Sequence, residues 1–310
     1  MTRPILSTSS TFAPATLAKV ERLLEILGVF NDDPVLGRAF VLQGGTALNM
    51  FLDELPRLSI DIDVMYVGSA GAPGMRRERP ALDARLREVT TKLGYTTRAT
   101  NDEHSGQTYR LRYDDEYLKI DVSYLARVPL LEPRLRTCTF ADPPVAYTVL
   151  DPFELAAGKV KALMERVAAR DLYDLARLAE RSPALLEEPL ARALIVRAVS
   201  SADPFPRMVD PTEALARFDD PPPEVVEPLR AVLSAEEQPD FGEMRARVER
   251  LLAPLSTPTP GESEYLRLLG EEADYRPELL FEPWPDVLDR ASRDPVMQWK
   301  VMNLGRRSAG

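Results

Sequence analysis

The chain has 310 residues, of which 45% are hydrophobic and 28% charged, and its formal net charge is −10. This is the composition of an ordinary globular protein, and the length favours two domains over one. Cys138 is the only cysteine and His104 the only histidine. Internal disulfides are therefore excluded, and sites built on several histidines or cysteines are nearly so. Any catalysis would depend on carboxylates, Lys and Arg, and His104 is expected in a loop.

The first half of the chain has a pattern of alternating helices and strands. The expected elements are a helix over 14–27 stopped by Gly28, a strand over 40–42, a helix over 47–52, a strand around Asp61 and Asp63, a helix over 76–93 that Pro80 interrupts or delays, and strands over 95–100, 107–113 and 117–125. The turn Asp114-Asp115-Glu116 predicts that the last two strands form a hairpin.

A glycine turn and an Asp-x-Asp pair lie close together in this half. The turn is Gly44-Gly45-Thr46, and a loop with Pro56, Arg57 and Ser59 leads from it to Asp61 and Asp63. Because side chains alternate along a strand, the two carboxylates share one face. Carboxylates suit Mg²⁺, and backbone N–H groups at a helix N-terminus suit a phosphate. Each feature alone is usually a solvated turn or strand edge, but together they predict adjacent metal and phosphate sites.

A third carboxylate lies on the strand 117–125. Lys119 and Asp121 face one way there, and Ile120 and Val122 face the other. Burying a neutral polar group without a partner costs about 2–7 kcal/mol. Burying an acid costs more, unless it is paired or bound to metal. An exposed sheet face is the alternative for this strand.

The second half is predicted to be helical and is punctuated by prolines. The expected elements are helices over 183–199, 223–233, 241–255 and 262–272, then an extended stretch with Pro277, Pro283 and Pro285. Lys159, Arg166 and Arg170 share one helix face. On one unbroken helix Asp171 would lie about 120° from Lys159, so the two side chains could serve one site only if the helix broke between them. The alternative is a solvated face on which Arg166 and Arg170 pair with Asp174, and Lys161 is assigned a structural role.

Six segments in order resemble the AbiEii/AbiGii toxin family, which includes the MenT toxins, within the nucleotidyltransferase superfamily related to DNA polymerase β. They are GGTAL (44–48), RLSIDID (57–63), KIDV (119–122), GKVKALMER (158–166), RDLYDL (170–175) and DPVMQWKVMN (294–303).

The resemblance implies an α+β fold, with an N-terminal nucleotidyltransferase domain with a mixed β-sheet over 1–145 and a mainly α-helical domain over 146–310. It implies Asp61, Asp63 and Asp121 as ligands of Mg²⁺, with Mn²⁺ as an alternative. The implied catalytic residues are Asp61, Asp63, Asp121, Lys159 and Asp171. Because Lys159 and Asp171 would then serve one site, the resemblance also predicts a break in their helix near 167–170. The implied nucleotide-binding residues are Gly44, Gly45, Thr46, Arg57, Ser59, Lys159 and Arg166.

The resemblance also implies a metal-dependent toxin that transfers a nucleotide from an NTP to RNA, with the tRNA 3′ end as the favoured acceptor and a cognate antitoxin as partner. One alternative is a nucleotidyltransferase for a small molecule such as an aminoglycoside, whose positive charge suits the acidic chain. Another is a non-catalytic nucleotide-binding module. No motif identifies which NTP is used.

Partners of other kinds are not expected. The chain has no apolar run long enough to span a bilayer and no secretory signal, which predicts a cytoplasmic protein without a membrane partner. Its acidity argues against non-specific binding to nucleic acid, and no DNA partner is expected. The densest cationic cluster is either an RNA-contacting patch or the solvated face of an amphipathic helix. It consists of Arg76, Arg77, Arg79, Arg85 and Arg87.

Overall fold

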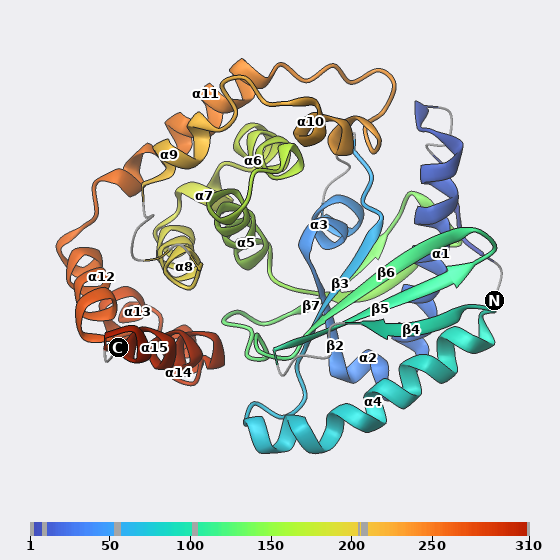
Figure 1. The fold of residues 1–310 in the computed structure, drawn as a ribbon, viewed down its shortest axis with the longest axis horizontal. Helices are drawn as coiled ribbons and strands as arrows, with labels where there is room; N and C mark the ends of the chain where they lie inside the picture. Colours follow the sequence, from blue (N-terminus) through green and yellow to red (C-terminus); the bar gives the residue numbers. More distant parts are fainter. Residues whose placement is uncertain are drawn as a thin grey trace. The chain divides into compact units, whose positions relative to one another are not determined.

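The computed structural model describes residues 3–7, 11–52, 57–100, 105–203, 205 and 210–308, so the predictions for Pro56 and His104 lie outside the described residues. The chain divides into two compact units. The first contains Met1–Asp151 and Val232–Glu237, and the second contains Pro152–Ala231 and Gln238–Gly310. Figure 1 shows the fold coloured along the chain.

The first unit is built on a seven-stranded mixed sheet with the order β4-β5-β6-β3-β2-β9-β7. The pairs β3–β6 and β2–β9 are parallel, and the other neighbours are antiparallel. The strands are β2 (Phe40–Gln43), β3 (Asp61–Tyr66), β4 (Thr96–Thr100), β5 (Gly106–Tyr113), β6 (Glu116–Ser123), β7 (Arg134–Cys138) and β9 (Val145–Val149), and a separate pair is formed by β1 (Ile5–Leu6) and β8 (Ala141–Asp142).

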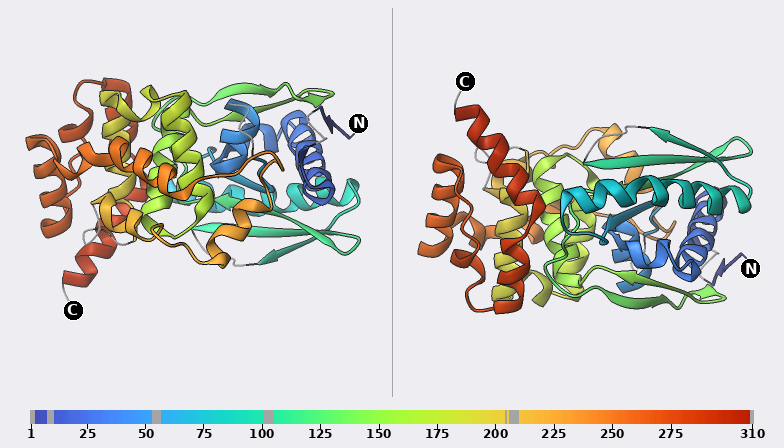
Figure 2. Two further views of the ribbon diagram at one scale, coloured as in Figure 1. Left: turned by 90° about the horizontal axis from the view of Figure 1, so that it is seen from above. Right: turned by 90° about the horizontal axis from the view of Figure 1, so that it is seen from below.

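The two faces of the sheet differ in polarity, as period-2 alternation requires. On β6, Leu118, Ile120 and Val122 are buried, whereas the residues between them are more exposed. Helix α4 (Ala72–Lys92) lies along the apolar face of β4 and β5 (Figure 2), and the hydroxyls of Thr90 and Thr97 are 2.7 Å apart there. The opposite face of β3 and β6 carries the aspartates, so the core itself fixes where the polar face lies.

Two expected helix boundaries in this unit are wrong. Helix α1 (Pro14–Asp32) continues past Gly28, and α4 continues through Pro80. An internal Gly costs about 1 kcal/mol and an internal Pro about 3, whereas burying one large apolar side chain contributes about 1.5–3. Phe30 of α1 is fully buried, and the buried apolar residues of α4 are Met75, Leu82, Leu86 and Val89. Burial therefore outweighs local propensity in both helices.

The other short helices of the first unit are α2 (Leu36–Ala39), α3 (Gly44–Ala47) and a π-helical turn over Leu48–Leu52. The segment 232–237 returns from the second half of the sequence, and the Leu58 N–H donates to the Val232 carbonyl at 2.8 Å. The strands β7 and β9 were not expected from the sequence.

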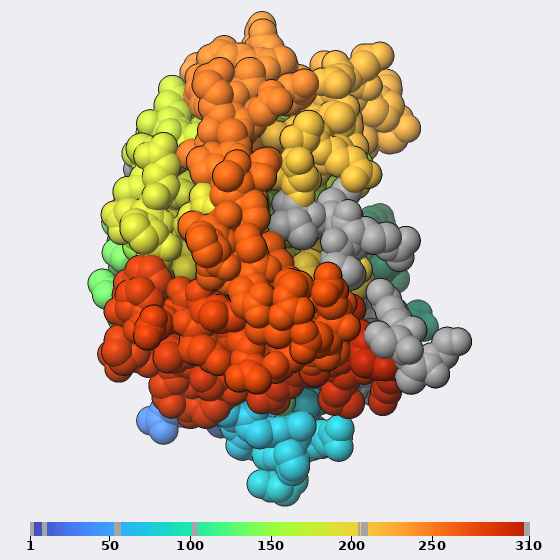
Figure 3. Space-filling model, turned by 90° about the vertical axis from the view of Figure 1, so that its left-hand side faces the viewer, coloured from blue at the N-terminus to red at the C-terminus, as the bar shows by residue number. Residues whose placement is uncertain are grey.

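The second unit is helical in its described residues. Its α-helices are α5 (Pro152–Glu165), α6 (Ala169–Arg181), α7 (Ala184–Glu187), α8 (Pro189–Ser200), α9 (Pro211–Ala216), α10 (Pro223–Arg230), α11 (Phe241–Leu252), α12 (Pro260–Glu272), α13 (Glu278–Phe281), α14 (Pro285–Ser292) and α15 (Pro295–Ser308). Figure 3 shows the side chains of the C-terminal helices, in orange to red, packed together.

Two expectations for this unit are also wrong. The helix expected over 183–199 is divided before Pro189, and the stretch expected to be extended around Pro277–Pro285 contains α13 and α14. Proline is tolerated in the first turn of a helix because its missing N–H would have no partner there. The prolines therefore start helices here rather than preventing them. Across the described ranges, no helix combines the length and the apolarity that crossing a membrane requires.

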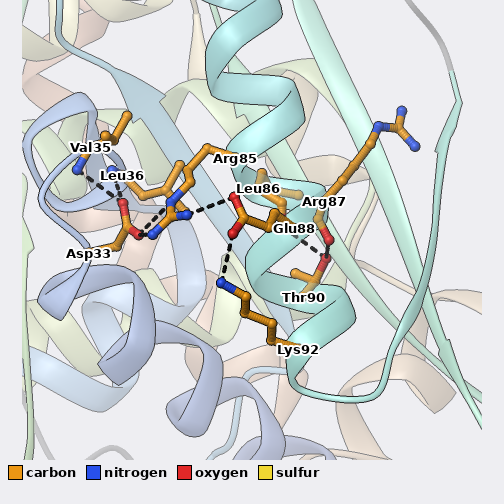
Figure 4. A network of polar contacts seen from close by, with 9 residues as sticks. All are labelled: Asp33, Val35, Leu36, Arg85, Leu86, Arg87, Glu88, Thr90 and Lys92. Carbon is orange, nitrogen blue, oxygen red and sulfur yellow. Dashed lines mark hydrogen bonds and ion pairs between the residues drawn. The ribbon is translucent and has the colours of Figure 1, made fainter.

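A polar network centred on Asp33 joins the end of α1 to α4 (Figure 4). The Asp33 carboxylate accepts hydrogen bonds from the Val35 and Leu36 N–H groups, both at 3.0 Å, and from Arg85 Nε at 2.8 Å. Burial tends to raise the pKa of Asp33, but Arg85 and the two N–H donors lower it below its ordinary value. Arg85 also pairs with Glu88, so this arginine has two carboxylate partners.

Replacing Asp33 with Ala is expected to lower the free energy of unfolding by about 1–3 kcal/mol, because two N–H groups and Arg85 lose their acceptor. The measurement is urea denaturation of the full chain. The neighbouring exposed Asp32 is the control, and Asp32→Ala is expected to change stability by less than about 0.5 kcal/mol.

The contact between Asp33 and its donors also makes the stability of the chain depend on pH. The pKa of Asp33 is lower in the folded than in the unfolded chain, so its stabilisation is present above about pH 4 and is lost as pH falls through the folded pKa. The difference between wild type and Asp33→Ala should therefore shrink at low pH. A difference that is constant from pH 7 down to the acid limit of folding would contradict this account.

Candidate functional site

The three predicted acidic residues lie on one face of two neighbouring parallel strands. Asp63 of β3 lies directly opposite Asp121 of β6, and Asp61 lies opposite Lys119. Partners in register on adjacent strands project to the same face. The Asp61 and Asp121 side chains are 31% and 36% exposed. The cluster is thus open to a ligand from solvent.

Lys119 lies between two of these carboxylates. Its Nζ is 2.8 Å from Asp121 Oδ2 and 4.0 Å from Asp61 Oδ1. Burial tends to lower the pKa of Lys119, but its hydrogen bond to Asp121 and the surrounding carboxylate charges raise it above its ordinary value. The ammonium therefore supplies positive charge at the point where the sequence predicts a metal ion.

The other oxygen of Asp121 also has a donor. Thr108 on the neighbouring strand β5 donates from Oγ1 to Asp121 Oδ1 at 2.6 Å. Within the described residues, no three acidic, histidine or cysteine side chains are grouped so that they could hold a metal ion. Metal binding by Asp61, Asp63 and Asp121 stays a prediction. It requires the Lys119 ammonium to move away from Asp61 and Asp121.

The glycine turn approaches Asp63 closely. Gly44 follows β2 directly and has φ +71°, in the left-handed region that favours glycine. A Cβ at this position would lie 3.1 Å from the Cβ and Cγ of Asp63 and nearer still to Oδ2. The absence of a side chain at Gly44 therefore leaves room for the Asp63 carboxylate.

The other two residues of the turn, Gly45 and Thr46, belong to the segment between β2 and β3. The buried Thr46 donates its hydroxyl to the Asp61 backbone carbonyl. The Gly45 carbonyl accepts a hydrogen bond from Asn49 Nδ2 at 2.7 Å. The Thr46 contact anchors the strand that carries Asp61 and Asp63, whereas the Asn49 contact lies within the helical segment after β2. The contact of Gly44, Gly45 and Thr46 with a nucleotide stays a prediction.

Arg57 and Ser59, also predicted to bind nucleotide, precede β3. Arg57 is only 2% exposed, and its Nη1 donates to the Leu58 carbonyl at 2.8 Å. It pairs as an isolated bridge with Leu233 of the returning segment. Ser59 is buried as well. Both residues therefore contribute to the packing of the approach to β3.

The predicted break after Lys159 is confirmed. Helix α5 ends at Glu165 and α6 begins at Ala169, with Ala168 in an extended conformation between them. The break turns Asp171 back towards Lys159, whose Nζ is 3.1 Å from Asp171 Oδ1. Asp171 and Lys159 are thus in direct contact within the second unit.

Lys159 has a second carboxylate partner, Asp174, at 2.7 Å from its Nζ. Asp171 and Asp174 are both fully buried, and Lys159 is 7% exposed. Arg166 adds two hydrogen bonds to Asp171, at 2.7 and 3.1 Å. Burial tends to raise the pKa of Asp171, but the charges of Lys159 and Arg166 lower it below its ordinary value.

The alternative contacts predicted for this segment differ from those found. Asp174 pairs with Lys159, whereas Arg166 pairs with Asp171. Lys161 makes a surface pair with Glu165 at 3.7 Å, in agreement with its structural assignment. The catalytic and nucleotide-binding roles implied for Lys159, Arg166 and Asp171 stay predictions.

The C-terminal family segment 294–303 has a structural role in the second unit. Asp294 is 1% exposed and pairs with Arg197 of α8. It also accepts from the Val296 N–H at 2.9 Å, at the start of α15. The buried Lys300 donates to the backbone carbonyls of Ala202 and Phe205. The segment therefore fastens α15 to α8 and to the chain after it.

Two residues beside the aspartates were not expected from the sequence to contact them, Lys119 and Thr108. The alternation along β6 already placed Lys119 on the same face as Asp121. What the sequence could not supply is the parallel register of β6 with β3, which sets Lys119 opposite Asp61.

Replacing Gly44 with Ala is expected to destabilise the chain by about 2 kcal/mol or more, through left-handed strain and the collision with Asp63. Gly94 is a matched control, since it has φ +87° but open space around its Cα. Gly94→Ala should show the strain alone, about 1–2 kcal/mol. Equal losses for the two variants in urea denaturation would contradict the close approach to Asp63.

Replacing Lys159 with Met is expected to cost about 3–5 kcal/mol of stability, because two buried carboxylates lose their shared cation. The control is Lys161→Met, which should change stability by less than about 0.5 kcal/mol. Urea denaturation of the full chain provides the measurement. A Lys159→Met variant as stable as wild type would show that the contacts of Lys159 with Asp171 and Asp174 do not stabilise the fold.

Comparisons with known proteins agree with the fold and the motifs. A family model described as the nucleotidyl transferase AbiEii toxin of type IV toxin–antitoxin systems matches residues 26–266. MenT4, a nucleotidyltransferase toxin from Mycobacterium tuberculosis H37Rv, superposes with a TM-score of 0.61 at 17% identity, over 89% of this chain and 92% of that chain. This likeness confirms the predicted α+β nucleotidyltransferase fold.

A second solved structure, the complex of CdnC with HORMA-deltaN from E. coli MS115-1, covers 91% of this chain and 93% of its own at 15% identity, but its TM-score is 0.29. No curated protein matched the sequence. Because the family model spans well over half of the residues, the chain belongs to the AbiEii family of nucleotidyltransferase toxins of type IV toxin–antitoxin systems.

Proposed function

We propose that this protein is a metal-dependent nucleotidyltransferase toxin that transfers a nucleotide from an NTP to RNA, with the tRNA 3′ end as the favoured acceptor. Membership of a toxin–antitoxin family implies an antitoxin as its partner. The observation that carries the proposal is the register that sets Asp63 opposite Asp121 with Asp61 on the same face.

The chemistry of these side chains fits a divalent cation. Carboxylate oxygens are the ligands that Mg²⁺ prefers, and it usually takes only one or two of them together with substrate phosphates. The face is partly exposed and already holds a cation, the Lys119 ammonium. We propose that Asp61, Asp63 and Asp121 hold Mg²⁺ or Mn²⁺. When bound, the ion would polarise the phosphate under attack and orient the reactants.

The residues of the chain itself would have three tasks in this reaction. Asp121, whose Oδ1 accepts from Thr108, would orient the acceptor hydroxyl and take its proton. Lys119, once displaced from Asp61 and Asp121, would offer its ammonium to the phosphates. Gly44 would keep Asp63 in position by leaving it space.

The proposal is tested by incubating the protein with each labelled NTP and a panel of acceptors that includes total tRNA, aminoglycosides and protein, with and without Mg²⁺. Label is expected on RNA only when Mg²⁺ is present. Asp63→Asn should lower the transfer rate at least about a hundredfold, because several kcal/mol of transition-state stabilisation depend on the carboxylate.

Asp115→Asn is the control for this experiment. It removes the same charge from an exposed position of the β5–β6 turn and should leave transfer within about twofold, since an exposed charge this far along the hairpin is largely screened. Label on a small molecule alone would replace RNA as the acceptor. Nucleotide binding without transfer to any acceptor would identify a non-catalytic module.

A further inference from the structure

The face of the sheet that carries the aspartates continues as a row of cations across two more strands. Arg98 of β4 lies opposite Arg110 of β5, and Arg110 lies opposite Lys119 of β6. Lys119 in turn lies opposite Asp61. Since partners in register share a face, this row extends from the acidic cluster to the edge strand β4. Adjacent strands are about 4.8 Å apart, so the row reaches roughly 10 Å beyond Lys119.

Two more exposed side chains on this face complete a patch. Arg112 follows Arg110 by two residues on β5, and it lies opposite Tyr117 of β6. Tyr117 is 55% exposed, one of the most exposed large apolar side chains of the described chain. We call Arg98, Arg110, Arg112 and Tyr117 the arginine face. All three arginines are exposed.

The arginine face has no evident structural purpose. Like charges directly opposite each other on neighbouring strands destabilise a sheet, by roughly 0.2–1 kcal/mol per pair. Among the described residues, no hydrogen bond or ion pair joins Arg98, Arg110 or Arg112 to a carboxylate. A sheet selected only for stability would alternate the signs of the charges here.

Three of the five arginines of the cluster on α4 behave differently. Arg85 pairs with Asp33 and Glu88 (Figure 4), Arg87 pairs with Asp83, and Arg79 donates to Gln107. These three arginines are used in joining α4 to its surroundings. The cations of the first unit that remain available to a ligand thus include those of the hairpin and β4, on the face that carries the aspartates.

We propose that the arginine face binds the phosphate backbone of the RNA acceptor and that Tyr117 stacks on one of its bases; this rests on the proposed function. Arginine presents a planar fork of donors that matches phosphate. An exposed aromatic ring among cations is the arrangement by which proteins bind single-stranded nucleic acid. The row ends at Lys119 and Asp61, so RNA lying along it would bring its end to the carboxylates.

The alternatives fit less well. A triphosphate held at the aspartates would not require cations two strands further away. An acidic protein partner would suit both the arginines and the exposed ring of Tyr117, but it would not account for a row that leads to Lys119 and Asp61. The acidic turn Asp114–Asp115 lies at the far end of the hairpin, beyond Arg112, and would repel RNA there, so the favoured path runs across the strands.

The test is fluorescence anisotropy of a labelled RNA hairpin with a single-stranded 3′ end, titrated with the full chain from 50 to about 300 mM salt, the range in which phosphate contacts dominate affinity. The triple variant Arg98→Gln, Arg110→Gln, Arg112→Gln should bind at least about tenfold more weakly. The slope of log K against log salt should fall by about 2, since each lost contact to a single strand removes about 0.7. Tyr117→Ala should weaken binding about fivefold or more with the slope unchanged.

The control variant is Arg38→Gln with Arg134→Gln. Both arginines are exposed and belong to the first unit, and Arg134 lies opposite Val149, on the other face of the sheet. Affinity and slope should match wild type. The triple variant should also melt at the same temperature as wild type or higher, because like-charge repulsion is relieved; a structural role for the three arginines would lower it.

The outcomes separate this inference from the proposed function. If wild type transfers a nucleotide to RNA but the triple variant binds RNA with unchanged affinity and slope, the arginine face is not the RNA surface and the proposed function stands. If wild type labels only a non-RNA acceptor, the proposed function fails, and absence of RNA binding would overturn the inference too. Unchanged RNA affinity with weakened binding of an acidic protein would assign the face to that protein.

Discussion

The parallel pairing of β3 with β6 is the constraint on which the candidate site depends. The buried side chains Ile62 and Val64 of β3 lie opposite Ile120 and Val122 of β6. A slip of one residue would turn one strand over and bury its aspartates in the core. Each charge buried without a partner would cost more than the roughly 2–7 kcal/mol needed to bury a neutral polar group. The hydrophobic effect that builds the core thus also sets the geometry of the carboxylates.

Each unit balances a pair of carboxylates with one lysine, but the two lysines differ in burial. Lys119 is 41% exposed and holds Asp61 and Asp121 at the surface, where an ion pair contributes about 0–1 kcal/mol. Lys159 is almost fully buried with Asp171 and Asp174, where losing one partner costs about 3–5 kcal/mol. Another cation can therefore replace Lys119 at small cost, whereas Lys159 is part of the packing.

The sequence predicted the parts of the site that depend on local pattern. Period-2 alternation placed Asp61 and Asp63 on one face and Lys119 with Asp121 on another strand, and helical geometry predicted the break before Asp171. The strand predictions follow from backbone geometry alone, whereas the break also required the family resemblance that puts Lys159 and Asp171 at one site. The family motifs supplied the order in which the segments belong together, which periodicity does not contain.

What the sequence could not supply depends on long-range packing. The parallel register of β3 with β6 sets Asp63 opposite Asp121, and no local signal encodes it, because α4, β4 and β5 separate the two strands in the sequence. Local propensity favours a helix boundary at Gly28 and at Pro80. Burial of the apolar face of each helix outweighs this preference, and both helices continue. Strands β7 and β9 are joined through β8 and Asp142-Pro143-Pro144 rather than by a tight two-residue turn, and the return of 232–237 depends on contacts with Leu58 and Thr11.

The net charge of −10 says little about what a given face of this molecule attracts. At physiological salt a charge is screened within about 8–10 Å, so a ligand on the hairpin is affected mainly by the residues of that face. Arg98, Arg110 and Lys119 follow one another across three strands there, whereas Arg85 and Arg87 on α4 are neutralised by their carboxylate partners. An acidic chain can in this way present a cationic path to its carboxylates, provided that its other basic side chains are already paired.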